Sequence, residues 1–496
     1  MRPSLEWNSI LALSATVLPL AAADICSKLE SANIQIEKKL AFGYSSTLQN
    51  YWSTACGDLK PTCIATPSSA QEVAHIMKEL HNVDELFAVK SGGHMPNNGF
   101  ASIQDGLLVS LENLNQVFYN EDDQTAVIGP GQAWEDAQKA LDNIHPGRAL
   151  VGGRLGGVGI GGFVVGGGLS FLSSQYGWTA NNVVNFQVVL ANGTIVDANK
   201  KENTDLFAAL KGGGSSFGIV TAYTMETHPQ DHKVWGGNYI FTHQQTPQVL
   251  EALRNFVDTY PDDKAAIICT YEHAAFVSTW IMFLFYDGPS PPEGVFDNFT
   301  AIGPIDTTKT WDTYYDLLKY NDQFILHGQR YHIATETTPL PAKPEILQKY
   351  YDHWYEVANN VLEVAGVIGS IAFQPMPTQI TSKAQAKGGD LIDLPDDQDY
   401  IIIELDFSWL FSADDSKIDA ALQHMYRGLD NIMRELVKEG SLPDVYRPLF
   451  MNDAYYRQDY WGRNRNRDKA LQTRLQYDPD GFWQQRTSGG FRLQPN

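Results

Sequence analysis

The spacing of apolar residues predicts alternating strands and helices over residues 62–225. Short apolar runs such as LFAV (86–89) and LLVSL (107–111) are typical of buried strands. WEDAQKALDNI (134–144) instead carries its apolar residues at helical spacing. Two further strands are expected on either side of the Asn-Gly pair at Asn192, because this dipeptide favours tight hairpins.

The pattern changes from Trp235 onward, where strand-like runs are separated by longer amphipathic helices. Helices are predicted over 247–260 and 344–364. The strand-like runs between and after them are NYIFT, AAIICTY, TWIMFLFYDG, IAFQPM and YIIIELDFSWL. An aromatic segment, 311–331, is expected either to pack in a core or to line an apolar ligand pocket. Together these elements predict an α+β fold with a largely antiparallel sheet backed by helices.

The composition and net charge of the chain argue against some classes of binding partner. The chain has 496 residues, 43% of them hydrophobic, which is long enough for two or three globular domains. Its formal net charge of −22 argues against nucleic acid or an anionic membrane as a partner.

The N-terminus resembles a secretory signal. Arg2 precedes an apolar run over 10–23 that ends in three alanines, a length too short to span a membrane. Residues 1–23 are therefore predicted to be a cleaved signal peptide, with a buried N-terminal helix as the alternative. The chain is expected in the extracellular space or the secretory lumen, and Asn192 and Asn298 are possible glycosylation sites.

Cysteine usage agrees with an oxidising compartment. Two of Cys26, Cys56 and Cys63 are expected to form a disulfide, although the sequence does not identify the pair. Cys269 lies within the apolar run AAIICTY and is predicted to be a buried free thiol.

The segment SGGHMPNNG (91–99) directly follows a predicted strand. One glycine is explained by a bend, since glycine adopts positive φ without strain. Two successive glycines followed by His94 suggest a backbone that approaches a bulky anion closely, because consecutive N–H groups form an anion-binding nest. The alternative is a tight turn with an incidental surface histidine.

Residues 152–168 contain ten glycines in seventeen positions. Gly157, Gly159 and Gly162 match the G-x-G-x-x-G pattern of dinucleotide-binding folds. That interpretation fails on context, because three further glycines interrupt the helix it requires and asparagine occupies the expected acidic position at residue 181. An extended segment that binds a long phosphate-bearing ligand through backbone amides is expected instead.

Several of these segments occur together in a recognisable order. VKSGGH, IGPGQAWEDAQKAL, GGRLGGVGIGGFVVGGGLSFLSSQYGW, NFQVVLANGTIVDAN and LFAALKGGGSSFGIVT resemble the FAD-binding domain of berberine-bridge-enzyme-like oxidases, in the vanillyl-alcohol-oxidase and p-cresol-methylhydroxylase superfamily. FMNDA and YDPDGFW resemble the closing segment of that family. The resemblance implies an FAD-binding domain formed by residues 24–230 and 441–496, with a substrate domain over 231–440.

The resemblance also implies how FAD is held. The family joins the flavin 8α-methyl to the histidine after the double glycine, which is His94 here. A second bond, from a cysteine, is not possible because Leu155 occupies that position, so a single covalent link is expected, as in relatives acting on secondary metabolites. Further FAD contacts are expected from Lys90, Ser91, Gly92, Gly93, Met95, Pro130, Gly131, Gly153, Val158, Gly159, Gly162, Gly166, Val220 and Asn452.

The implied activity is that of an FAD-dependent oxidase. It would remove a hydride from a small organic substrate, such as an alcohol, a sugar or a secondary metabolite, and transfer the electrons to O2. Val158 occupies the position at which valine is usual in oxidases that react quickly with O2 to give H2O2. The alternatives are an oxidative cyclase and a non-catalytic protein that retains its flavin; an NAD-linked dehydrogenase is disfavoured by the failed fingerprint.

Two acids are candidates for the catalytic base. Relatives use a tyrosine in an Asn-Tyr motif near the C-terminus, where this chain has Asn452 followed by Asp453. Relatives also place an acid on the strand that reads YIIIELDFSW here, in which Glu404 and Asp406 share one face. Asp453 is the first candidate and Glu404 the second. The alternative is that Glu404 and Asp406 face solvent.

Overall fold

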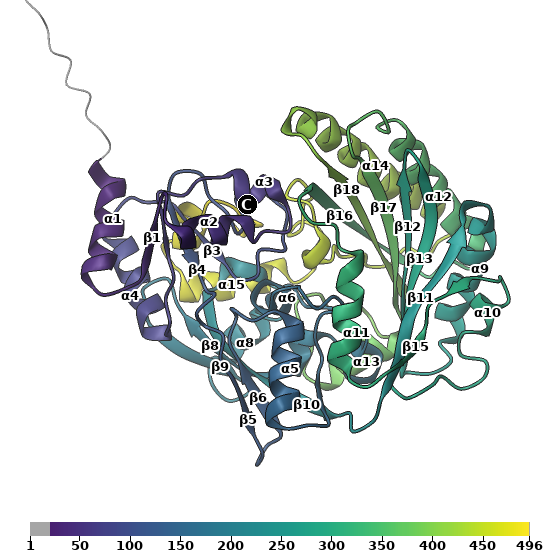
Figure 1. Cartoon of the computed structure of the whole chain (residues 1–496), viewed down its shortest axis with the longest axis horizontal. Helices are drawn as coiled ribbons and strands as arrows, with labels where there is room; N and C mark the ends of the chain where they lie inside the picture. The colour runs from purple at the N-terminus through teal and green to yellow at the C-terminus, as the bar shows by residue number, and fades with distance from the viewer. Residues whose placement is uncertain (1–19, 496) are drawn as a thin grey trace, which may run out of the picture.

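The computed structural model describes residues 20–495 and contains three β-sheets arranged in two halves (Figure 1). The two smaller sheets belong to the N-terminal part, and the C-terminal residues return to lie among them. The largest sheet forms the other half, with long helices on its outer side. The predicted signal peptide lies almost wholly outside the described residues, which begin with helix α1 (Leu20–Ser31).

The first sheet combines parallel and antiparallel pairs. Its strands in spatial order are β1 (Ile36–Lys38), β2 (Cys63–Ala65), β4 (Leu107–Ser110) and β3 (Phe87–Lys90). Strands β2, β4 and β3 run parallel, and helix α4 (Ala70–His81) lies between β2 and β3 in sequence. A disulfide joins Cys26 of α1 to Cys63 of β2, while Cys56 and Cys269 are buried free thiols.

The second sheet is antiparallel and is centred on one long strand. Its strands in spatial order are β5 (Val117–Asn120), β6 (Thr125–Ile128), β10 (Ile219–Pro229), β8 (Val183–Val189) and β9 (Ile195–Asn199), with β7 (Arg148–Leu150) also paired to β10. Helix α5 (Trp134–Ile144) has the predicted bounds. The hairpin predicted at Asn192 is confirmed as the β8–β9 turn.

The third sheet has eight strands, and all of its pairs are antiparallel. Its strands in spatial order are β14 (Ile305–Asp306), β11 (Val234–Thr242), β13 (Val277–Tyr286), β12 (Ala265–Ala274), β17 (Ile368–Met376), β18 (Tyr400–Trp409) and β16 (Arg330–Pro339), with β15 (Lys309–Trp311) also paired to β11. The predicted α+β class, with a largely antiparallel sheet, is confirmed.

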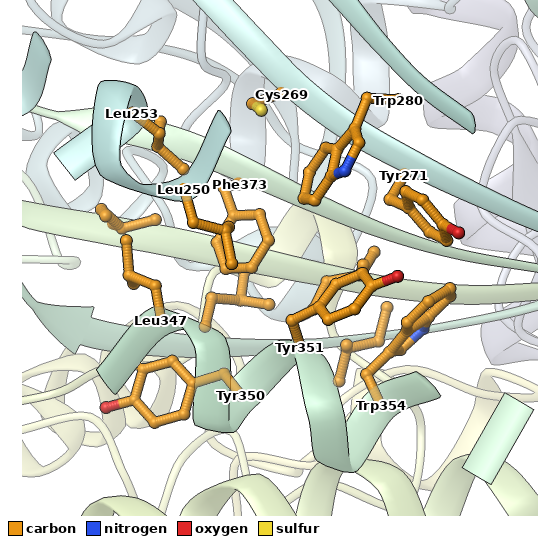
Figure 2. Close-up of a cluster of buried hydrophobic side chains, with 14 of the residues drawn as sticks. Leu250, Leu253, Cys269, Tyr271, Trp280, Leu347, Tyr350, Tyr351, Trp354 and Phe373 are labelled. Atoms are coloured by element: carbon orange, nitrogen blue, oxygen red, sulfur yellow. The ribbon is translucent and has the colours of Figure 1, made fainter. Parts of the chain in front are cut away.

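Helices cover one face of the third sheet. They are α9 (Thr246–Thr259), α12 (Pro344–Asn359) and α14 (Asp415–Lys438). Figure 2 shows part of the core between sheet and helices, where Leu250, Tyr351 and Trp354 meet Phe373 and Trp280. Since side chains alternate along a strand, the residues between these core positions project from the opposite face, toward the glycine-rich loops.

The C-terminal residues pack against the N-terminal sheets. Helices α15 (Arg467–Tyr477) and α16 (Phe482–Arg486) lie in this part. Phe482 and Trp483 belong to the same buried cluster as Phe87 of β3, and the Arg486 guanidinium donates to the backbone carbonyl of Glu85. Residues near the C-terminus therefore pack directly against β3 of the first sheet.

Short helices complete the chain, and one of them corrects an expectation. The glycine-rich stretch is not extended throughout, because α6 (Ile160–Val165) is helical and ends where Gly166 begins the next glycine triplet. The other short helices are α2 (Phe42–Gln49), α3 (Thr54–Asp58), α7 (Ser173–Tyr176), α8 (Thr204–Ala209), α10 (Asp297–Thr300), α11 (Tyr314–Asn321) and α13 (Thr378–Ala386).

Candidate active site

A cavity of about 700 Å³ lies between the free face of the third sheet and the glycine-rich loops. One side is formed by loops of the N-terminal part together with C-terminal residues such as Asn452 and Gly490. The other side is formed by side chains of β12, β13, β16, β17 and β18. The cavity therefore brings together segments from almost the whole length of the chain.

Two glycine loops of this cavity touch each other. A Cβ added to Gly92 would lie 2.5 Å from the Cα of Gly159, so neither position accepts a side chain without a shift of the backbone. Ser91 reinforces the contact, because its hydroxyl donates to the carbonyl of Pro130 at 2.5 Å and accepts from the N–H of Gly161 at 3.1 Å. The sequence predicted a backbone that approaches a bulky ligand closely. The structure shows that the two glycine loops also lie in close contact with each other.

The cavity suits a long anionic ligand that is bound by backbone groups. A Cβ added to Gly162 would meet nothing within 4 Å, so bare backbone faces the cavity at this point. Arg154 is the one lysine or arginine among the cavity-lining residues that the structure describes, and its guanidinium is directed to Gln374 of the third sheet. Phosphate groups on the loop side would therefore be held by N–H groups, as in an anion-binding nest. The residues present fit FAD.

Asn452 holds the glycine-rich stretch in place. Its side-chain amide donates to the carbonyl of Phe163 at 3.1 Å, and its side-chain oxygen accepts from the N–H of Gly168 at 3.2 Å. A Cβ on Gly166 would lie 2.7 Å from this side-chain oxygen. The C-terminal segment thus fixes one wall of the cavity.

His94 lies in the cavity and takes part in a stack of three rings. Its ring lies on Trp52, with centroids 4.4 Å apart and an angle of 6° between the planes, and Trp52 lies on Tyr331 at 4.0 Å. Burial, together with nearby His327, lowers the pKa of His94 to about 4. The imidazole is therefore neutral at physiological pH. The alternative of an incidental surface histidine is wrong.

Asp453 and Glu404 share a hydrogen-bond donor. The Gln374 side-chain amide donates to Asp453 at 2.8 Å and to Glu404 at 3.3 Å, and its carbonyl accepts from the Arg154 guanidinium. Gln374 is fully buried, so this network fixes the orientation of its amide. The structure therefore brings both candidate bases to one point, and the alternative that Glu404 faces solvent is wrong.

The two acids differ in how easily they ionise. Burial raises the pKa of Asp453 to about 6, with Gln374 and Arg154 acting in the opposite direction. Burial raises the pKa of Glu404 well above its usual range, and the neighbouring Asp453 raises it further. Of the two acids, Asp453 is therefore the one that ionises more easily.

A second acidic pair lines the same cavity beside the first. Glu272, Ser370 and Asp406 occupy one row across strands β12, β17 and β18, and the Ser370 hydroxyl donates to Glu272 at 2.7 Å. Burial raises the pKa of Glu272 to about 7 and that of Asp406 well above its usual range. Asp406 thus also faces the cavity rather than solvent.

Most residues predicted to contact FAD line this cavity. They are Ser91, Gly92, Gly93, His94, Met95, Pro130, Val158, Gly159, Gly162, Gly166, Val220 and Asn452. Lys90, Gly131 and Gly153 are not among the lining residues. Lys90 is buried, with its ammonium group 5.0 Å from the centre of the Tyr51 ring. A Cβ on Gly131 would meet the carbonyl oxygen of Leu111 at 2.3 Å, and a Cβ on Gly153 would meet the Trp134 ring at 2.6 Å.

Sequence reasoning missed the cavity-lining residues Trp52, Arg154 and Glu272, and it missed Gln374, which holds the two acids from behind the cavity wall. Arg154 carried a usable signal, because it is the one charged residue in the stretch 152–168. Glu272 and Gln374 lie in apolar strand-like runs, where an isolated polar residue on the inner face is a comparable signal. Nothing in the sequence around Trp52 distinguishes it from a core aromatic residue.

Comparisons with known proteins agree with this site. Residues 61–199 match the family model described as an FAD binding domain. An uncharacterized FAD-linked oxidoreductase of Arthroderma benhamiae is 45% identical over 95% of this chain and 94% of its own length. The bifunctional solanapyrone synthase of Alternaria solani is 31% identical, with 89% of this chain and 83% of that protein covered.

Solved structures show the same fold. A xylooligosaccharide oxidase from Myceliophthora thermophila matches with a TM-score of 0.77 at 20% identity, covering 96% of this chain and all of the other. Berberine bridge enzyme from Eschscholzia californica matches with a TM-score of 0.76 at 18% identity, covering 95% of this chain and all of the other. The chain belongs to the FAD-linked oxidoreductases, with the fold of berberine bridge enzyme.

Proposed function

We propose that this protein is a secreted FAD-dependent oxidase in which Asp453 takes a proton from the substrate as a hydride leaves it. The observation that carries the proposal is the position of Asp453, whose pKa is about 6, in the same cavity as His94 and the glycine loops. Bound FAD supplies the hydride acceptor and returns the electrons to O2, which gives H2O2.

Asp453 is the better of the two candidate bases. A base works best when its pKa lies near the working pH, and Asp453 meets that condition while it remains mostly ionised. The raised pKa of Glu404 favours its protonated form, which can donate a hydrogen bond to the substrate oxygen or nitrogen. Gln374 holds both acids through its side-chain amide.

His94 is proposed to carry FAD through a single covalent link. Its low pKa keeps the ring nitrogen unprotonated, which nucleophilic attack on the flavin requires. Leu155 lines the cavity where a second link would need a cysteine thiol. We therefore propose one attachment point. Val158 also lines the cavity and is proposed to admit O2.

Secretion is supported by the disulfide between Cys26 and Cys63, since such bonds persist in oxidising compartments. Among the described helices, none combines the length and the apolar character needed to cross a membrane. Asn192 and Asn298, the two possible glycosylation sites, are both exposed. Residues 1–23 are proposed to direct the chain into the secretory pathway.

A second candidate function is oxidative cyclisation. The name of the Alternaria solani relative, a bifunctional solanapyrone synthase, favours it. Both candidates begin with the same hydride removal at the same acids. They differ in whether the oxidised product leaves directly or closes a ring first.

The test is the rate of anaerobic flavin reduction by a substrate found in a screen of alcohols, amines and secondary-metabolite-like compounds. Asp453→Asn should lower this rate by roughly 10²–10⁴ and leave the visible flavin spectrum intact, because only the proton acceptor is lost. Glu404→Gln should have a smaller effect. Asp468→Asn is the control, since Asp468 is exposed and lies on α15 outside the cavity. Wild-type rates in both cavity variants would exclude both acids as the base.

A further inference from the structure

We propose that the substrate is a predominantly apolar molecule rather than a carbohydrate, with its body in an apolar half of the cavity and its reacting carbon at Asp453 and Glu404. The inference rests on the proposed function only for the position of the reacting end. The apolar character of the substrate is inferred from the residues that line the cavity.

The chemistry of the third sheet changes across its strands on one face. On β13 and β12, Phe283 lies opposite Ile268 and Ile281 lies opposite Thr270. The row that contains Thr270 continues through Ala372 of β17 to Glu404 of β18. Ile268, Ile281 and Phe283 therefore form an apolar half of this wall, which is bounded by Glu404 of β18 and by Glu272 in the neighbouring row of β12.

The loop after α11 covers the apolar half. Phe324 packs edge-on against Phe283, with ring centroids 5.3 Å apart, and Ile325 also lines the cavity. Leu155 and Val158 line it from the side of the glycine loops. A ligand in this half is therefore enclosed by aliphatic and aromatic groups on several sides. The aromatic segment 311–331 thus contributes to a ligand pocket through its C-terminal end, whereas Tyr314 within it is buried in a core.

Few polar side chains accompany these apolar ones. The polar side chains that β12, β13 and the covering loop contribute to the cavity lining are Thr270, Thr279, Gln323 and the acid Glu272. An oligosaccharide carries a hydroxyl on most of its carbons, and a hydroxyl buried without a hydrogen-bond partner is unfavourable. An apolar body instead gains free energy in proportion to the surface it removes from water.

The apolar surface continues to the outside of the molecule. Val277 and Leu326 line the cavity and are 54% and 45% exposed, and Phe276 at the turn between β12 and β13 is fully exposed. Exposed apolar groups at the edge of an apolar cavity are typical of a ligand-binding entrance. A ligand that enters past Val277 passes the row of Thr279 and Glu272 and then reaches Ile281 and Phe283, which lie further along β13.

The experiment measures binding to the purified holoenzyme through changes in visible flavin absorption. The probes are 4-alkylbenzyl alcohols, from methyl to hexyl, compared with xylobiose and cellobiose. Each added methylene should tighten binding about fourfold, which corresponds to ~0.8 kcal/mol. Ile281→Thr should weaken binding of the hexyl compound several-fold. Ile305→Thr is the matched control, because Ile305 is 68% exposed on β14 and does not line the cavity.

The outcomes separate this inference from the proposed function. Affinity that rises with alkyl length and falls in Ile281→Thr supports the inference, even if none of these alcohols reduces the flavin. Binding of the disaccharides with higher affinity than the hexyl compound overturns it, although oxidation of a disaccharide would still support an oxidase. Alkyl affinities that do not depend on chain length also overturn it. Flavin content and thermal melting of each variant report whether it has folded.

Discussion

Replacing Gln374 with leucine should move the pH dependence of flavin reduction without removing either acid. Gln374 is fully buried, and its amide N–H groups donate to Asp453 and Glu404. A hydrogen bond to a carboxylate favours its ionised form, so loss of the donor raises the pKa of the base. Because the ionised base is the active form, the rate rises as pH passes upward through that pKa. The rising limb should therefore move to higher pH.

The size of the shift follows from the geometry. A hydrogen bond to a charged group contributes about 1.5–3 kcal/mol, and 1.36 kcal/mol corresponds to one pKa unit. Loss of the 2.8 Å bond should therefore raise the pKa of Asp453 from about 6 by roughly 1–2 units. At pH 7 the ionised fraction of Asp453 then falls from about nine-tenths to between about one half and about one tenth. Reduction at pH 7 should slow roughly two- to tenfold and recover near pH 9.

The assay is anaerobic stopped-flow reduction across the pH range, at saturating substrate. Gln385→Leu, on the exposed side of α13, is the matched control and should follow the wild-type profile. A Gln374→Leu profile that is uniformly lower but has the wild-type midpoint would show that Gln374 only supports the structure. A profile that overlays the wild type would refute the reasoning about the base.

Three further predictions test other parts of the site. His94→Ala should release its flavin on acid denaturation, whereas the wild type retains it on a gel; flavin that washes out of the wild type would exclude the covalent link. Val158→Leu should slow reoxidation by O2 more than anaerobic reduction, and equal slowing of both would argue against a role in oxygen access. Cys26→Ala opens a disulfide that spans 37 residues, so unfolding in urea should show a loss of about 4 kcal/mol, matched by reductant in the wild type.

The fold was most predictable where the local pattern is strong. The bounds of α5 and the turn at Asn192 follow from helical spacing and from the Asn-Gly pair. Helix α14 and strand β16 were not predicted. In β16, residues 333–338 are all buried, so no polar alternation marks the strand. The disulfide partner of Cys26 also depends on three-dimensional distance, which three candidate cysteines do not reveal.

Residues of the candidate site were predictable only where they belong to a recognisable sequence motif. His94 and Asp453 were found through segments that resemble a family. Gln374 and Glu272 act through neighbours on adjacent strands, and the register that brings Glu272 beside Ser370 is not encoded locally. Side-chain alternation did predict that two acids of β18 share a face. The local sequence does not show that this face lines the cavity, because that depends on how the third sheet packs against the glycine-rich loops.

The return of the C-terminal segment has a consequence for how the protein is made. Asn452 fixes the glycine-rich stretch, and Gly490 and Phe491 line the same cavity. The ribosome adds these residues after every other segment that lines the cavity, so the cavity cannot close around FAD before they have been synthesised. Cofactor capture must therefore follow the synthesis of this segment. For a chain exported during synthesis, FAD would have to be present in the compartment where the finished chain folds.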